Sequence, residues 1–208
     1  MLVFRHLIHS LDPSEGGVSS SVHSLHQALK DFGVNSLLCD TPEIINKNSS
    51  SNTLNVVHGL WHWPSRIALQ IKNKHRIPYV IFPHGMLDPW FKKTYPFKHL
   101  KKQIYWLVKE GISVRDANYL CFTTHEEMKL ARHTFMPYRC EEKVIGLGVD
   151  SPPAKNLSIH KKLWSKFPEL IDKKVLLYLG RFHEKKGVDL LLNTWIQRNP
   201  KDAMLVLA

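Results

Sequence analysis

Short apolar runs alternate with helical segments along this chain of 208 residues, and that alternation restricts its fold more than any other feature. Gly, Pro or Asn bounds the runs, as in buried strands, and the segments between them carry apolar residues at helical spacing. The expected strands are 2–8, 35–39, 53–58, 78–82, 119–123, 143–145, 175–179 and 203–208, and the expected helices are 17–32, 64–75, 97–110, one beginning near 124, and 188–197. This pattern predicts an α/β fold with a parallel sheet covered on both faces.

The chain is longer than an average domain of ~100–150 residues, and its 43% hydrophobic content is ordinary for a globular protein. Residues 146–154 (GLGVDSPPA) have the composition of a linker. We therefore expect one domain at residues 1–145 and the first part of another at 146–208. The last expected strand runs to Ala208, and a parallel sheet needs neighbouring strands, so we expect the second domain to be incomplete.

The formal net charge of +11 favours anionic partners, such as nucleic acid, acidic lipid or phosphorylated substrates, without choosing among them. Cys39, Cys121 and Cys140 match neither a metal-binding pair nor a disulfide framework, which fits a reducing cytoplasm. The N-terminus lacks a signal-peptide pattern, and no stretch approaches ~18 consecutive apolar residues, so we expect a soluble or peripheral protein.

Glycines open the first expected helix, where Glu15 precedes Gly16 and Gly17. Glycine lets the backbone approach a ligand closely, and a helix N-terminus presents free N–H groups to an anion. A plain turn that needs a positive φ explains the same glycines, and the spacing does not match a dinucleotide fingerprint.

Two further loops follow apolar strands, where open α/β sheets bind their ligands. His84 stands between Pro83 and Gly85 after the fourth strand, either as a functional residue or as the cap of a turn. The segment 180–187 (GRFHEKKG) places Arg181 and Lys186 after a strand of the second domain. Arginine and lysine suit a diphosphate, although a solvated basic turn is the commoner fate of such a charge run.

Lysines and aromatic residues are interleaved between Phe91 and Lys109, with no acid among them. The aromatic residues are Phe91, Tyr95, Phe97, Tyr105 and Trp106, and the lysines are Lys92, Lys93, Lys98, Lys101, Lys102 and Lys109. This composition suits an anionic membrane surface, and a solvated helix with a buried aromatic face is an equal alternative. Stacking on nucleic acid is less favoured, because the chain carries no RRM, KH or helix-turn-helix signature.

His58 and His62 are four residues apart, like paired zinc ligands on a helix, but His58 ends a strand and no third ligand is evident. We therefore expect no metal site. His23 and His26 are expected on the surface of the first helix, and Trp61 and Trp63 as packing or rim aromatics.

Together, the Gly16-Gly17 loop, the Pro83-His84-Gly85-Met86 loop and the segment 180–187 resemble one family, the retaining glycosyltransferases of the GT-B fold called glycosyl transferase group 1 (family four). The stretches 58–64 and 83–90 look most like the bacterial members that build polysaccharides. The resemblance covers nearly the whole chain, and its most specific part is Gly180-Arg181 with Lys186-Gly187.

The resemblance implies two Rossmann-like domains, an acceptor against the first and a nucleotide-sugar against the second. Arg181 and Lys186 would hold the donor diphosphate, Glu15, Gly16, Gly17 and Gly85 would line the site, and His84 would contact the transferring sugar or the acceptor. It implies same-face substitution without a protein nucleophile, and neither cofactor nor metal. The chain departs from the family in lacking paired glutamates spaced E-x7-E, which contact the donor, and in its linker, where the family often has Pro and Asn.

The expected function is therefore transfer of a hexose from a nucleotide-sugar to a glycan or lipid-linked acceptor in cell-surface polysaccharide synthesis, with the 208-residue chain itself expected to be inactive. The expected location is cytoplasmic or peripheral on the inner face of the plasma membrane. The alternative is a non-catalytic module that binds a glycan or a membrane through its basic face. Nucleic acid is not an expected partner.

Overall fold

The computed structural model describes residues 2–43, 52–149, 151–152, 154 and 157–208. The chain divides into two compact units, Met1–Val149 (the N-terminal unit) and Asp150–Ala208 (the C-terminal unit). We describe each unit by itself. No helix among the described residues has the length and apolar character needed to cross a membrane.

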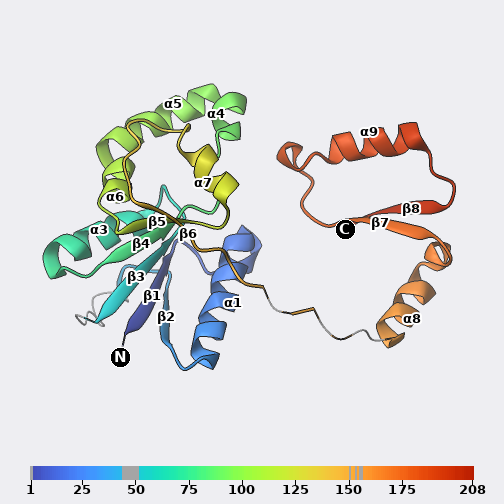
Figure 1. The fold of residues 1–208 in the computed structure, drawn as a ribbon, viewed down its shortest axis with the longest axis horizontal. Helices are drawn as coiled ribbons and strands as arrows, with labels where there is room; N and C mark the ends of the chain where they lie inside the picture. Colours follow the sequence, from blue (N-terminus) through green and yellow to red (C-terminus); the bar gives the residue numbers. More distant parts are fainter. Residues whose placement is uncertain (1, 44–51, 150, 153, 155–156) are drawn as a thin grey trace. The chain divides into compact units, whose positions relative to one another are not determined.

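The described part of the N-terminal unit holds a parallel sheet of six strands in the order β2-β1-β3-β4-β5-β6, which is Rossmann-like (Figure 1). The strands are β1 (Val3–Ile8), β2 (Asn35–Cys39), β3 (Thr53–His58), β4 (Tyr79–Phe82), β5 (Tyr119–Phe122) and β6 (Glu142–Val144). Each strand pairs in register with its neighbour, as in Val3 with Asn35 and with Thr53. The predicted parallel α/β sheet is therefore confirmed.

Helices cover both faces of this sheet, with α1 on one side and α3 and α6 on the other (Figure 1). The helices are η1 (Pro13–Glu15), α1 (Gly17–Asp31), α3 (Trp63–His75), α4 (Trp90–Thr94), α5 (Pro96–Tyr105), the π-helical turn η2 (Trp106–Glu110), α6 (Gly111–Arg115) and α7 (His125–Ala131).

The helix expected at 97–110 was predicted too short, because the consecutive helical segments α5, η2 and α6 run from Pro96 to Arg115. Gly111 does not end it, since its φ is not positive and a Cβ there would lie 2.7 Å from Trp106 O.

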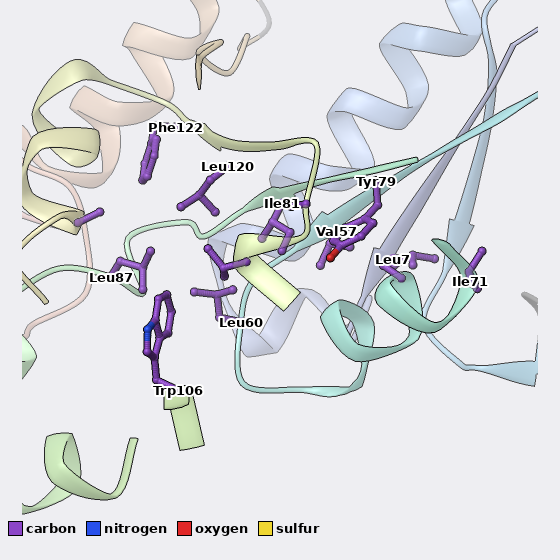
Figure 2. Close-up of a cluster of buried hydrophobic side chains, with 14 of the residues drawn as sticks. Leu7, Val57, Leu60, Ile71, Tyr79, Ile81, Leu87, Trp106, Leu120 and Phe122 are labelled. Carbon is purple, nitrogen blue, oxygen red and sulfur yellow. The ribbon is translucent and has the colours of Figure 1, made fainter. Parts of the chain in front are cut away.

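The main core lies between the sheet and the helices that follow β3 and β4 (Figure 2). Strand residues such as Leu7, Val57 and Ile81 meet Ala68 of α3 and Trp106 of η2, and all of them are buried. Trp106 donates from Nε1 to the Pro137 carbonyl at 2.9 Å, and its ring stacks on Phe135 with centroids 5.2 Å apart.

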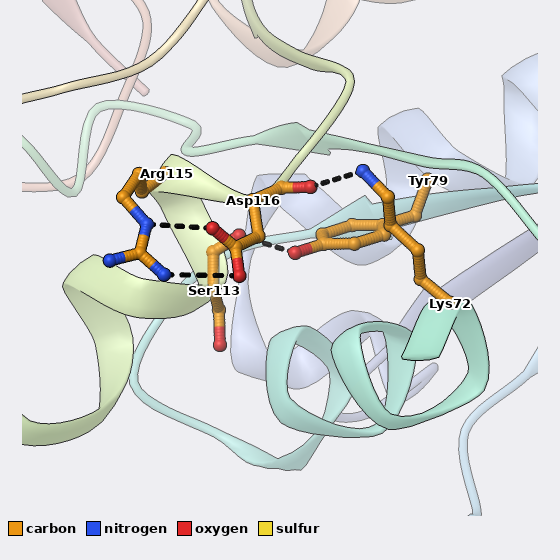
Figure 3. A network of polar contacts seen from close by, with 5 residues as sticks. All are labelled: Lys72, Tyr79, Ser113, Arg115 and Asp116. Carbon is orange, nitrogen blue, oxygen red and sulfur yellow. Dashed lines mark hydrogen bonds and ion pairs between the residues drawn. The ribbon is translucent and has the colours of Figure 1, made fainter. Parts of the chain in front are cut away.

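A polar network fastens α3, β4 and α6 together at one end of this core (Figure 3). Tyr79 Oη donates to the Ser113 carbonyl at 2.6 Å, and Lys72 Nζ donates to the Asp116 carbonyl at 2.6 Å. Burial raises the pKa of Tyr79 above its ordinary value, with the nearby carboxylates of Asp116 and Glu110 adding to the effect. Tyr79 therefore stays a neutral donor at any physiological pH.

The described residues of the C-terminal unit hold two parallel strands, β7 (Lys174–Tyr178) and β8 (Ala203–Leu207). Its helices are α8 (Leu157–Lys166), η3 (Pro168–Leu170), η4 (Glu184–Lys186) and α9 (Val188–Arg198), of which α8 was not predicted. Val175, Leu176 and Leu177 of β7 each remain close to half exposed. Apolar residues on a parallel pair are normally covered on both faces, so this pair resembles the inner part of a larger sheet.

We predict that Trp106→Ala lowers the free energy of unfolding of the N-terminal unit by about 3–5 kcal/mol, because a large buried side chain leaves a cavity. Trp106 is 2% exposed, whereas its neighbour Leu107 is 54% exposed and supplies a matched control. Leu107→Ala should change stability by less than about 0.5 kcal/mol. Urea unfolding followed by tryptophan fluorescence and circular dichroism measures both. Equal losses in the two variants would contradict the orientation of this helix.

Candidate functional site

The order of the strands reverses beside β1. The chain passes from β1 to β2 on one side and then crosses to β3 on the other. In open α/β sheets, ligands bind beyond the carboxyl ends of the strands at such a reversal. The loops that leave β1 and β3 there bring His9 and His62 face to face, with ring centroids 3.8 Å apart. This edge of the sheet is the first candidate for a binding site.

Three histidines form a hydrogen-bonded row that ends at this edge. His6 in β1 and His58 at the end of β3 are buried, and His84 follows β4 in a partly buried loop. His6 Nδ1 lies 2.9 Å from His58 Nε2, and His58 Nδ1 lies 3.0 Å from His84 Nε2. The rings of His58 and His84 also stack with centroids 5.3 Å apart. The row links the interior of the sheet to the surface.

The row has two possible directions, because each neutral imidazole carries one N–H and one lone pair. In one direction His6 donates to His58, His58 donates to His84, and His84 keeps an N–H on Nδ1. In the other direction every proton moves to the opposite nitrogen, and His6 carries its N–H on Nε2. That atom is buried and has no hydrogen-bond partner within the described residues. In the first direction the same atom carries a lone pair that is also buried without a partner among these residues, so it does not decide between the two directions. His84 Nδ1 is a donor in the first direction and an acceptor in the second.

All three imidazoles are neutral at physiological pH. Burial lowers the pKa of His6 to about 4, with the charge of His26 adding to the effect. Burial also lowers the pKa of His84 to about 4, although the carboxylate of Glu127 opposes the shift. The pKa of His58 falls well below its ordinary value, first because of burial and then because of His84 and His6. The row is therefore a set of dipoles rather than of charges.

Backbone strain marks the loops at this edge. His84 has a φ of 49° and Trp61 a φ of 76°, a region in which residues other than glycine are uncommon. Glu127 of α7 holds the first of these loops, because one carboxylate oxygen accepts from Gly85 N at 2.8 Å. The other accepts from Thr123 N at 2.9 Å and from Thr123 Oγ1 at 2.7 Å. His84 is thus fixed in position before any ligand arrives.

An open pocket of about 430 Å³ lies between this loop and the start of α1. It is lined by Gly17, Val18, Ser21, His84, Gly85, Thr123 and Glu127. Gly16 caps α1 with a φ of 126°, and neither a capping side chain nor an acid occupies the first turn of the helix. The free N–H groups of that turn and the His84 imidazole suit an oxygen-rich or anionic ligand.

A second, more apolar cavity of about 310 Å³ lies beside the same edge. Its lining includes Trp61 and His62 after β3, Met86 and Asp88 after β4, and residues of α4, α5 and the segment after α7, namely Phe91, Tyr95, Lys98, His99, Lys102, Thr134 and Phe135. Lys102 Nζ lies 4.6 Å from the centroid of the Trp61 ring, and burial lowers its pKa. Flat aromatic walls with two lysines suit a ligand that combines a ring or apolar part with an anionic group.

The C-terminal unit carries the loop that contains Arg181 and Lys186. Both side chains are exposed, and Tyr178 Oη donates to the Arg181 carbonyl at 2.9 Å. Gly187 caps α9 with a φ of 66°, and a pocket of about 320 Å³ lies at the start of that helix. Phe182, His183, Glu184, Val188 and Asp189 line this pocket, which therefore contains two carboxylates and neither Arg181 nor Lys186.

The structure brings Gly17, His84 and Gly85 together in one pocket, with Gly16 capping the adjoining helix. Glu15 is exposed in η1 and does not line that pocket, and Arg181 and Lys186 belong to the other unit. His58 and His62 have separate partners, His58 in the row and His62 at His9. No group of three potential metal ligands occurs within the described ranges.

Sequence reasoning missed Glu127 and the buried partners of His84. The pattern Thr124-x-x-Glu127 is a capping-box signature that could have indicated Glu127. Thr124 Oγ1 does accept from Glu127 N at 3.1 Å, but the Glu127 carboxylate reaches Gly85 and Thr123 instead of the helix cap. His26, expected on the surface, is only partly exposed and lies with Nδ1 2.7 Å from Ser36 Oγ.

No protein-family model matches this chain, and no curated protein matches it.

We predict that the free energy of unfolding falls as the pH drops from about 6.5 to about 5, by roughly 1.4 kcal/mol per pH unit for each histidine that stays neutral in the fold. A pKa near 4 in the folded state means that the unfolded chain binds more protons in this window, so acid favours unfolding.

His84→Asn supplies the matched variant, because asparagine tolerates a positive φ and does not titrate. Urea titrations at several pH values should give this variant a slope against pH that is smaller by about one proton. An identical slope in both proteins would show that His84 is protonated in the fold.

Proposed function

We propose that this protein is a nucleotide-sugar-dependent glycosyltransferase, or part of one, with the two Rossmann-like domains of the GT-B arrangement. One observation carries the proposal: two pockets of different chemistry, one polar around His84 and one aromatic with lysines, lie at the carboxyl edge of one parallel sheet. A transferase needs separate places for an oxygen-rich group and for an acceptor. The sequence resemblance to glycosyl transferase group 1 adds the expected donor loop at 180–187.

In this proposal the acceptor occupies the aromatic cavity of the N-terminal unit. Sugar rings stack on flat aromatic faces, and Trp61, Tyr95 and Phe135 supply such faces. Lys98 and Lys102 attract an anionic group on the same molecule. The acceptor class that fits is a glycan or a lipid-linked sugar that carries phosphate.

The transferring sugar lies against the polar pocket. The Nδ1–H of His84 donates to a sugar or phosphate oxygen, and the first turn of α1 supplies further N–H groups. When His6 donates to His58 and His58 donates to His84, the N–H of His84 is on Nδ1. Because the loop is already fixed by Glu127, little ordering is required when the substrate binds.

The nucleoside diphosphate is held by the C-terminal unit, through Arg181, Lys186 and the N-terminus of α9. In the transfer, the C–O bond between the sugar and the diphosphate breaks and a C–O bond to the acceptor hydroxyl forms. The proton of that hydroxyl leaves with the departing phosphate oxygen. Arginine stabilises the charge on the leaving group through its paired N–H donors. The half-exposed apolar residues of β7 support the view that this unit belongs to a larger domain.

We predict that the chain binds nucleoside diphosphates and that Arg181→Ala weakens this binding by on the order of tenfold or more, because a charge-assisted pair of hydrogen bonds is lost. Isothermal titration with UDP, GDP, ADP and dTDP measures it. Lys201→Ala removes an exposed positive charge from the same unit and should leave binding unchanged.

Placed in a longer protein that completes the proposed second domain, the same two variants test turnover with a panel of nucleotide-sugars and acceptors. There Arg181→Ala should reduce transfer by on the order of a hundredfold or more. Equal nucleotide binding by the wild type, Arg181→Ala and Lys201→Ala would refute the proposal that the loop at 180–187 binds the donor. Glycan binding without any affinity for nucleotides would favour the alternative of a non-catalytic module.

A further inference from the structure

The helix of α5 and η2 presents its apolar side to solvent. Large apolar residues recur at helical spacing on this side: Phe97, Leu100, Ile104, Leu107 and Val108, here called the outward face. They are between 54% and 84% exposed. A surface helix normally turns such a stripe toward the core. In this helix the apolar stripe faces solvent instead.

Specific contacts on the opposite side fix this orientation. Trp106 is buried against Phe135, and the ring of His99 stacks on Phe135 with centroids 4.6 Å apart. Met136 N donates to Gln103 Oε1 at 3.1 Å. The helix therefore cannot roll to bury its apolar stripe without breaking the core. Of the interleaved aromatic residues, Trp106 is buried, as in the alternative of a buried aromatic face, while Phe97 is exposed.

The charge around the outward face identifies what covers it. Six exposed lysines occur between Asp88 and Glu110, with no acid among them. Lys98 and Lys102 line the aromatic cavity, and the four that do not are Lys92, Lys93, Lys101 and Lys109. The carboxyl group of Glu110 is buried and does not reach this surface. A second copy of the same face would bring like charges together, whereas an anionic membrane satisfies both the lysines and the apolar stripe.

We propose that the outward face docks on an anionic lipid bilayer, with its apolar side chains in the interfacial region and the flanking lysines at the headgroups. This inference concerns attachment of the protein to a membrane and goes beyond the proposed function. It is tested independently of nucleotide binding, because its residues belong to the N-terminal unit and the loop at 180–187 belongs to the C-terminal unit.

Co-sedimentation of the 208-residue chain with vesicles tests whether the apolar side chains of the outward face contribute to membrane binding. The vesicles contain phosphatidylcholine with or without phosphatidylglycerol. Leu100→Gln/Ile104→Gln/Leu107→Gln should reduce partitioning onto the anionic vesicles by on the order of a hundredfold, since three apolar side chains no longer enter the interface. Glutamine is a good helix former and the positions are exposed, so the variant should keep the circular dichroism spectrum and stability of the wild type.

Phe32→Gln/Ile145→Gln/Val149→Gln is the matched control, because it replaces three exposed apolar residues elsewhere in the N-terminal unit. It should bind vesicles like the wild type. Equal losses in the two triple variants, or no loss in either, overturn the proposal.

A second pair of variants tests the charge. Lys93→Gln/Lys101→Gln/Lys109→Gln should weaken binding to anionic vesicles by on the order of a hundredfold, since each lysine near such a surface contributes about a fivefold factor. Lys30→Gln/Lys74→Gln/Lys129→Gln removes the same net charge from other exposed positions and should have a much smaller effect.

High salt should weaken wild-type binding, because it shortens the range of the attraction. Binding of the wild type to neutral vesicles alone, or to neither kind, overturns the proposal. So does light scattering that shows a dimer which the glutamine variant of the outward face dissociates, because a second copy would then be the occupant.

Discussion

β1 is hydrogen-bonded to β2 along one edge and to β3 along the other, and the candidate site depends on this double pairing. The parallel register brings the carboxyl ends of β1, β3 and β4 to one edge, so the loops that follow them meet although they are far apart in sequence. His9, Trp61 and His84 each follow a different strand. Shifting a strand by one residue would move His6 and His58 to opposite faces of the sheet and break the row.

The helix of α5 and η2 contributes to two surfaces of the N-terminal unit, the aromatic cavity and the outward face. Its inner side supplies Lys98, His99 and Lys102 to the aromatic cavity, and its outer side carries the apolar stripe. An amphiphilic acceptor that resides in a membrane would meet both surfaces of one rigid element. In the proposed enzyme, attachment and acceptor binding thus share a helix, whereas binding of the nucleotide belongs to the other unit.

Local sequence pattern was sufficient for most of the sheet. The expected strands at 35–39 and 53–58 agree with β2 and β3, because apolar runs bounded by loop residues have few other conformations open to them. Local sequence pattern was insufficient where tertiary packing determines the length or orientation of an element. The helix expected at 97–110 continues through Gly111 to Arg115, and the sequence left open whether the aromatic side of this helix faces the core. The position of His84 at the carboxyl edge of the sheet followed from its place after an expected strand, whereas its buried partners depend on strand order, which a sequence alone does not give.

The histidine row also couples the protonation of the surface imidazole to the interior. His84 Nδ1 carries an N–H when His6 donates to His58, and it carries a lone pair when the row runs the other way. A ligand that accepts at His84 Nδ1 and a ligand that donates to it therefore select opposite tautomers of all three imidazoles. A change of ligand at the end of β4 thus changes which nitrogen of His6 carries the proton in β1, although no ligand touches His6.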